Sequence, residues 1–261
     1  MALLSTDAVV LHAFDYLESS RILRLATREG GVRSVLARGA RRSTRRFGSA
    51  LDLFAEGVAE IHTRPGRELD TLGGFDVRRA RPHLAADLGR FLGASAIAEL
   101  MLRFTRESAD PELYDALVRT LDDLGAADAA HAREAAIAGA WRVVAALGFA
   151  PTVESCAECH ASLADDEITM FSHPTGGALC RRCSRLAVAG RVLPAPARLA
   201  LVAWLRGGRV SLDAAASVRA HQRLLREFLS EHLADERPLR AFAAWEHDAW
   251  GSPEAPVVAS R

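Results

Sequence analysis

The sequence predicts an α+β multidomain fold, with an N-terminal five-stranded barrel followed by an all-α helical domain that carries a four-cysteine module. Three observations predict it. Short apolar and β-branched segments fill residues 1–80, the apolar residues recur at helical spacing after residue 81, and all four cysteines lie between 152 and 192. We therefore expect a barrel domain over 1–80, a helical domain over 81–250 with the module inserted at about 152–192, and a flexible tail over 251–261.

The first part of the chain contains five short segments with strand character. Gly30 and Gly31 separate two of them and can supply the positive φ of a tight hairpin turn, while Gly57 is placed for a β-bulge. Five short strands in so short a segment are typical of a small barrel, and an oligonucleotide-binding (OB) barrel is the leading choice. The predicted strands are 8–14, 20–28, 32–38, 51–63 and 69–77.

Helical spacing begins at Leu84 and continues to Leu102. Asp110 is placed as an N-cap before Pro111, because a short acidic side chain can accept from the free N–H groups and proline suits the first helical position. A third helix should end near Gly148, before Pro151. Further helices are predicted over 196–206, 214–234 and 238–248.

Composition excludes some kinds of chemistry. The chain has 261 residues, with 33 basic and 33 acidic side chains and no net charge, and every basic residue is arginine. Without lysine there is no P-loop lysine and no Schiff base. The N-terminal segment lacks a basic start and is interrupted by acids, and no apolar run could span a bilayer, so we expect a cytoplasmic protein.

Two CxxC pairs form the sharpest motif in the chain. Cys156 and Cys159 form the first pair, and Cys180 and Cys183 form the second. Pairs at this separation can place four thiolates at the corners of a tetrahedron, as one structural Zn²⁺ requires, so we expect zinc with these ligands. Iron in a four-thiolate site is the rival metal. A redox pair would need one CxxC in a βαβ setting, and four buried thiols would not need paired spacing.

Several neighbours of the cysteines could take part in the same site. His160 and His173 could each replace a cysteine ligand, although a full set of four cysteines needs neither. Arg181, Arg182 and Arg185 flank the second pair, where they can offset the charge of the thiolates or contact DNA. A closed four-thiolate site has no open position, so the expected role of the metal is structural.

A basic run begins in the third predicted strand and continues beyond it. Six arginines and no acid lie between positions 33 and 46, and an aromatic residue, Phe47, comes next. Arginine binds phosphate, and an aromatic ring can stack on an unpaired base, although such a ring can equally be a core anchor. The residues predicted to bind DNA are Arg33, Arg38, Arg41, Arg42, Arg45, Arg46, Phe47, Arg64 and Arg67.

No catalytic signature is present. HExxH, GxSxG and GxGxxG motifs are missing from the sequence, so no catalytic residue is assigned. Asp122 and Asp123 are expected on a solvated helix face. Asp165, Asp166 and Glu167 could hold a metal for nuclease chemistry, although a solvated turn between the cysteine pairs accounts for them equally simply.

Taken together, these motifs resemble the RecO family of bacterial recombination mediators. The opening from Ala8 to Arg41 has the family's strand, its D-Y-x-E-S-x-R-I turn and the strand pair that leads to a basic segment. The stretch from Arg46 to Phe54 resembles its R-F-G-x-x-L-x-x-F motif, and the stretch from Gly66 to Leu72 resembles its G-x-x-L-x-T-L strand. Gly148-Phe149 with Pro151, and the cysteine spacing, also fit.

The resemblance implies a non-enzymatic mediator of DNA repair. It implies binding of single- and double-stranded DNA, annealing of complementary strands, and joint action with RecR to help RecA load onto DNA covered by the single-strand binding protein SSB. It also implies association with the nucleoid and a helical domain that receives the acidic, hydrophobic SSB tail. Arg142, beside Trp141, is one candidate for the terminal carboxylate of that tail.

Two other classes of function remain open from the sequence. One is a zinc-containing nucleic-acid enzyme such as a nuclease, and the other is an interaction scaffold whose barrel binds protein. An assay with complementary oligonucleotides separates the three. Annealing without cleavage would indicate the mediator, metal-dependent cleavage would indicate the enzyme, and no DNA binding at low salt would indicate the scaffold.

Overall fold

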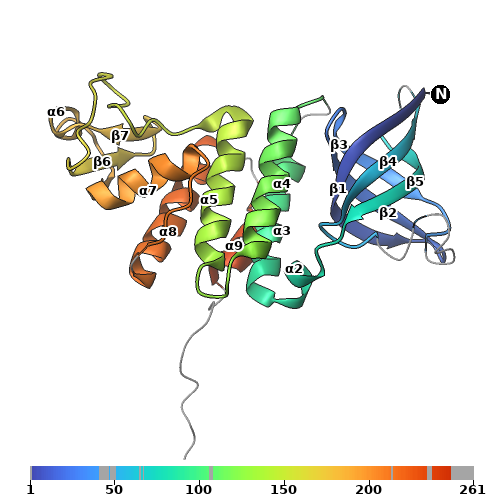
Figure 1. Cartoon of the computed structure of the whole chain (residues 1–261). Helices are drawn as coiled ribbons and strands as arrows, with labels where there is room; N and C mark the ends of the chain where they lie inside the picture. The colour runs from blue at the N-terminus through green and yellow to red at the C-terminus, as the bar shows by residue number, and fades with distance from the viewer. Residues whose placement is uncertain are drawn as a thin grey trace, which may run out of the picture.

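The structure is a computed structural model, in which a barrel, a helical region and a small cysteine-containing module follow one another along the molecule (Figure 1). It describes residues 2–40, 47, 51–64, 66, 68–105, 108–212, 214–233 and 237–247. The predicted flexible tail and most of the basic run between positions 41 and 50 lie outside these residues.

The N-terminal strands close into the predicted five-stranded barrel. Neighbouring strands follow the order β1-β2-β3-β5-β4, β1 pairs antiparallel with β4 to close the ring, and β3 pairs parallel with β5. This is the strand order of an OB barrel, so the predicted fold class is confirmed. The strands are β1 (Ala2–Tyr16), β2 (Ser20–Thr27), β3 (Gly31–Ala37), β4 (Glu56–Thr63) and β5 (Asp70–Arg79).

Two glycines are where the sequence placed them, but the first strand is longer than predicted. Gly31 has a φ of 67° in the β2–β3 hairpin, and the β4–β5 register shifts at Gly57. A Cβ on Gly57 would lie 2.2 Å from the carbonyl oxygen of Asp76, so only glycine fits there. β1 begins at Ala2 instead of residue 8, because its first half pairs along the whole of β4.

The barrel has two apolar surfaces. Its interior is filled by alternate residues of the strands, which include Leu23, Leu25, Val35 and Ile61. Its outer surface also carries buried apolar side chains, among them Ala26 and Val32, which belong to the same cluster as the core of the helices. One side of the barrel is therefore packed on the helical region, and the rest of the outer surface is left for other contacts.

The helical region contains seven described helices. They are α2 (Pro82–Ala86), α3 (Leu88–Phe104), α4 (Pro111–Ala126), α5 (Ala132–Val144), α7 (Ala195–Leu205), α8 (Ala215–His232) and α9 (Arg240–His247). Asp110 caps α4 by accepting from the N–H of Leu113 at 2.9 Å, as predicted. The helix expected from Leu84 onward is instead divided at Asp87, whose extended backbone ends α2 and whose side chain caps α3.

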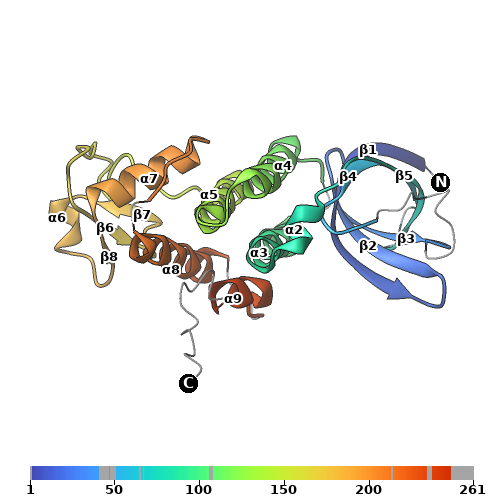
Figure 2. The same ribbon diagram turned by 60° about the horizontal axis from the view of Figure 1, so that its bottom comes forward.

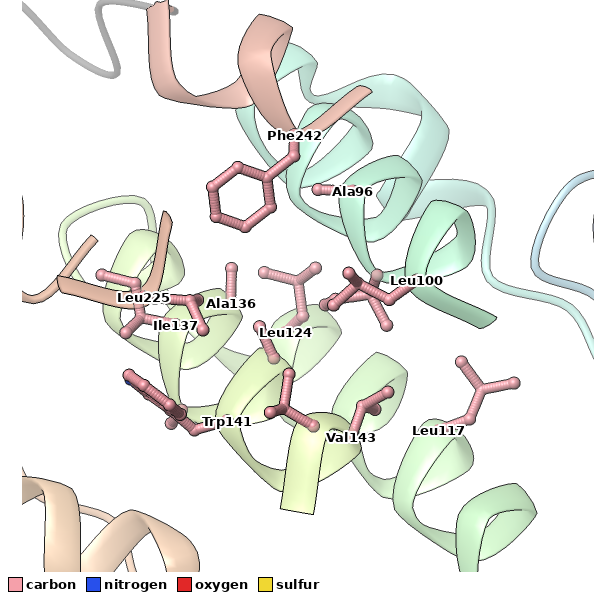
Figure 3. Close-up of a cluster of buried hydrophobic side chains, with 14 of the residues drawn as sticks. Ala96, Leu100, Leu117, Leu124, Ala136, Ile137, Trp141, Val143, Leu225 and Phe242 are labelled. Carbon is pink, nitrogen blue, oxygen red and sulfur yellow. The ribbon is translucent and has the colours of Figure 1, made fainter. Parts of the chain in front are cut away.

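The helices share one apolar core (Figure 3). Trp141 lies on α5 with its whole side chain buried, and it packs against Phe228 of α8 with ring centroids 5.1 Å apart. α5 continues through a short π-helical turn (Ala145–Phe149) and ends at Gly148, whose φ of 93° breaks the helix before Pro151, as predicted.

α4 and α5 approach each other closely at Gly139. A Cβ at this position would lie 2.1 Å from Cγ2 of Thr120, a buried residue whose hydroxyl donates to the carbonyl of Ala116 at 2.7 Å. Gly139→Ala should destabilise the protein by about 1–3 kcal/mol, because the overlap outweighs the better helix propensity of alanine, worth up to about 1 kcal/mol.

Thermal and urea unfolding would measure this effect. Thr120→Ser in the Gly139→Ala background is expected to recover most of the loss, since serine keeps the hydroxyl and removes the overlapping methyl group. A Gly139→Ala variant as stable as the parent would show that the two helices can separate at no cost.

The cysteine-containing module packs on the far end of the helices (Figure 2). It contains a three-stranded sheet of order β7-β6-β8 and a short helix. Phe171 and Leu193 of this sheet join the helical core, and Phe171 lies 6.0 Å from Phe228 between ring centroids. The elements are β6 (Thr169–Ser172), β7 (Gly177–Leu179), α6 (Arg181–Ser184) and β8 (Arg191–Leu193). Among the described residues, no helix is both long and apolar enough to cross a membrane.

Candidate metal centre and nucleic-acid interface

The four cysteines converge in the module. Their sulfur atoms all lie within 4.8 Å of one another, and Cys159 and Cys180 are 3.8 Å apart between sulfurs. Cys156 stands at the start of a tight turn, in which the N–H of His160 donates to its carbonyl at 2.8 Å, and Cys180 precedes α6. The two turns thus bring both CxxC pairs to one point, as the spacing predicted, and the set can hold a metal ion.

The surroundings of the sulfurs favour a bound cation. Burial raises the pKa of the Cys156 thiol, but the N–H groups of Cys159 and Cys180 outweigh this effect and lower it to about 6. Burial and the neighbouring thiols raise the pKa of Cys183 to about 12. Four clustered thiols therefore cannot all ionise by themselves, and a divalent cation is what would allow it.

The other candidate ligands lie elsewhere. His173 is held by Glu227 of α8 at 3.0 Å, and burial lowers its pKa. His160 is exposed with a φ of 60°. Asp165 and Asp166 are exposed in the turn between the cysteine pairs. Within the described residues, the cysteine sulfurs are the group whose ligand atoms converge.

One arginine beside the cysteines interacts with the sulfurs directly. Hydrogen bonds from Arg182 to Cys159 and Cys183 raise the pKa of its guanidinium. Arg181 and Arg185 are exposed. Arg182 therefore fits the charge-offsetting role considered for this trio.

The residues predicted to bind DNA divide into four groups. Arg38 and Arg64 are exposed at strand ends, whereas Arg33 donates to the carbonyl of Gly30 at 2.9 Å and lies 3.7 Å from the buried carboxylate of Asp70. Phe47 is 1% exposed in the barrel core, so its ring is not free to stack on a base, and its inclusion among the DNA-binding residues is wrong. Arg41, Arg42, Arg45, Arg46 and Arg67 lie outside the described residues.

The barrel also exposes a set of side chains that the sequence analysis did not single out. Paired residues of β1, β2 and β3 face outward together: His12 with Arg24 and Ser34, and Phe14 with Ile22 and Leu36. Tyr16 follows on the same side of β1. We call these residues the outer face: His12, Phe14, Tyr16, Ile22, Arg24, Ser34 and Leu36.

The outer face combines aromatic rings with positive charge. Phe14 is 44% exposed and Tyr16 is 42% exposed, and the rings of His12 and Phe14 lie 5.7 Å apart between centroids. Arg24 is partly exposed, and its Nε is buried without a hydrogen-bond partner in the described structure. The face continues past Leu36 into a hollow of about 370 Å³, which is lined by Arg38 together with the acidic residues Glu68 and Asp70. The alternation His-Ala-Phe-Asp-Tyr in the sequence was the signal that could have predicted it.

A second pocket lies between α4, α5 and the end of α7. It has a volume of about 430 Å³ and is lined by Trp204, Arg142 and Arg209. Asp123 pairs with Arg142 at 3.0 Å and with Arg209 at 2.6 Å, so both guanidinium groups are already engaged. Asp123 is therefore an ion-pair partner and not simply part of a solvated helix face. Asp122 is also an ion-pair partner, since its carboxylate lies 2.7 Å from the guanidinium of Arg81.

Comparisons with known proteins match both halves of the chain. Residues 1–81 match the family described as Recombination protein O N terminal, and residues 85–241 match the family described as Recombination protein O C terminal. A protein of Anaeromyxobacter dehalogenans, named DNA repair protein RecO, is 39% identical over 246 residues, which cover 90% of this chain and 93% of the relative.

Two further relatives carry the same name. One, from another Anaeromyxobacter strain (Fw109-5), is 36% identical over 244 residues, covering 92% of this chain and 94% of its own length. The other, from a Nocardioides species, is 30% identical over 243 residues, covering 91% and 96%. With a closed OB-type barrel, a helical region and converging cysteines that fit both halves, the chain belongs to the RecO family of DNA repair proteins.

Proposed function

We propose that this protein is a non-enzymatic recombination mediator that binds single- and double-stranded DNA and anneals complementary strands. The observation that carries the proposal is the outer face, where exposed aromatic rings and Arg24 lie side by side on an OB-type barrel. Bases of any sequence can stack on such rings while arginines neutralise the phosphates. Annealing needs no nucleotide hydrolysis, because neutralised strands repel each other less and meet more often.

We also propose the partners that the family suggests: RecR, RecA as an indirect partner, and the SSB tail. The pocket lined by Arg142 and Trp204 is one place where the helical region offers apolar walls beside a cation. An acidic tail would have to displace Asp123 from Arg142 to bind there. The residues that contact RecR are not assigned.

The metal that we propose for the cysteine site is one structural Zn²⁺. Its proposed ligands are Cys156, Cys159, Cys180 and Cys183, whose sulfurs already lie close enough to share one ion. With four thiolates the coordination shell is complete, so the ion would hold the two turns together and leave no position for substrate.

The test of the proposed function is an annealing assay with two fluorescent complementary oligonucleotides, with no nucleotide added. The proposal predicts faster pairing than without protein, and intact strands afterwards. Cleavage that depends on Mg²⁺ would instead make the protein a nuclease, and no DNA binding at low salt would make the barrel a protein-binding scaffold.

The arginine run supplies a further prediction. If Arg38 and its neighbours hold about four to six phosphates, the log–log salt slope for a single strand should be roughly −3 to −4. Replacing Arg41, Arg42, Arg45 and Arg46 together with alanine should flatten that slope and weaken binding to all sequences alike, because phosphate contacts carry no base information.

Titrations of labelled poly-dT at several salt concentrations would measure the slope. We expect the melting temperature to stay nearly constant, since the sequence predicts that these arginines lie in a solvated loop, where such side chains contribute little to stability. An unchanged slope in the quadruple variant would show that the phosphates are held elsewhere on the protein.

A further inference from the structure

The module and α8 enclose a cleft that neither the outer face nor the cysteine site uses. We call it the β8–α8 cleft. Its volume is about 350 Å³, and its walls are aliphatic: Val192, Leu193 and Pro194 on one side, Ala220 and Leu224 on the other. Val192 is 73% exposed, so this wall remains open to solvent. The figures show this part of the molecule at the end remote from the barrel (Figures 1 and 2).

Positive charge lines the rim of the cleft without matching negative charge. Arg223 borders it, and Arg219 lies one helical turn away, about 6 Å along the axis of α8. Both are exposed, and within the described part of the chain neither has an ion pair. By contrast, Arg191 at the opposite rim is held by Glu227, and Arg226 is held by Glu246 at 2.9 Å.

The base of the cleft adds no charge at neutral pH. His221 is 2% exposed, packs on Trp204 with ring centroids 4.8 Å apart, and has no hydrogen-bond partner on either ring nitrogen in the described structure. Burial lowers its pKa to about 4, so the ring is neutral. The site therefore presents aliphatic walls, an uncharged base and two free arginines in line.

We propose that the β8–α8 cleft is a second DNA site, in which Arg219 and Arg223 bind successive phosphates of a single strand and one base turns into the cleft. A line of cations along a helix suits a chain that carries a charge at every repeat. A peptide that ends in one carboxylate would need only one cation, placed at the cleft itself. Arg219 lies outside the lining of the cleft, so a second cation at this position suits a strand with several phosphates better than such a peptide.

This site extends the proposed function and depends on it. Annealing requires that two strands be brought together. A second site at the other end of the molecule would let a single chain hold a strand at each end. Its loss should therefore impair annealing much more than it impairs the binding of one strand.

The test compares Arg219→Ala/Arg223→Ala with Arg119→Ala/Arg240→Ala, which removes the same charge from exposed positions on α4 and α9. We expect annealing of complementary oligonucleotides to slow by roughly five-fold or more only in the first variant. The salt slope of the weaker binding step should become shallower by roughly 1.4, at about 0.7 per phosphate contact. The melting temperature should not change.

A photo-crosslink locates the strand independently. A thymidine oligonucleotide with one 4-thiothymidine should crosslink to peptides from residues 190–194 or 220–224 in the wild-type protein. Equal annealing by both variants without such crosslinks would overturn the second site and leave the proposed function intact. An acidic Asp-Asp-Asp-Leu-Leu peptide that binds there while the oligonucleotide does not would also overturn it. A wild-type protein that neither binds nor anneals DNA would instead remove the proposed function.

Discussion

Replacing Cys156 with serine is expected to release the metal ion and unfold the cysteine-containing module. Cys156 is fully buried, and its sulfur accepts from the N–H of Cys180 at 3.4 Å, so it joins the two CxxC turns. The module has only a small apolar cluster of its own, built largely around the cysteines. Structural zinc sites contribute on the order of 10 kcal/mol to folding, far more than this cluster can replace.

Elemental analysis of protein purified without added metal would measure the ion, and limited proteolysis would report the unfolding. We expect one zinc per wild-type chain, none in the Cys156→Ser variant, and new cleavage between residues 152 and 192. His160→Asn is the matched control, because asparagine tolerates the positive φ at this position and leaves all four sulfurs in place. A variant that keeps its zinc, or a wild-type protein that contains iron or no metal, would contradict the assignment.

Arg81→Ala is expected to destabilise the whole protein by at least about 2 kcal/mol, because it removes a buried guanidinium that hydrogen-bonds to two partly exposed carboxylates and a carbonyl at the junction of barrel and helices. The Arg81 side chain is 1% exposed and reaches Glu56 at 2.6 Å and Asp122 at 2.7 Å. It also donates to the carbonyl of Phe54 at 2.9 Å. One guanidinium thus ties β4, the preceding loop and α4 together.

Arg78→Ala is the matched control for this variant. Arg78 pairs with Asp7 at 3.0 Å, but both side chains are largely exposed, so its loss should cost at most about 1 kcal/mol. Urea unfolding of both variants would give the comparison. If Arg81→Ala unfolded no more easily than Arg78→Ala, the junction would be held by its apolar contacts alone.

Local signals in the sequence predicted much of this fold. Asp110 before Pro111, Gly31 in a hairpin and Gly148 at a helix end act through their own backbone, so each could be recognised without knowing its neighbours. The spacing of the cysteines was sufficient to predict the metal site for the same reason, because each CxxC pair forms a single local turn. The break at Asp87 was missed because the apolar spacing of the flanking helices continues across it.

Features that depend on contacts between distant segments could not be predicted in this way. Phe47 follows a basic run, and only the closed barrel shows that its ring fills the interior. Arg142 was predicted as a candidate to bind the terminal carboxylate of the SSB tail. Its guanidinium already pairs with Asp123, which lies on the preceding helix, α4. The β8–α8 cleft exists only because the module packs against α8, and no local pattern marks it.

The most direct test of the central claim is whether the outer face holds a single strand. Binding of labelled poly-dT would be measured for the wild type, for Phe14→Ala/Arg24→Ala, and for Leu3→Ala, which truncates an exposed apolar residue where β1 pairs with β4. Loss of one stacked base costs about 1–3 kcal/mol, so the double variant should bind at least roughly five-fold more weakly with an unchanged melting temperature. Leu3→Ala should bind like the wild type. Equal affinity of all three proteins would contradict the claim.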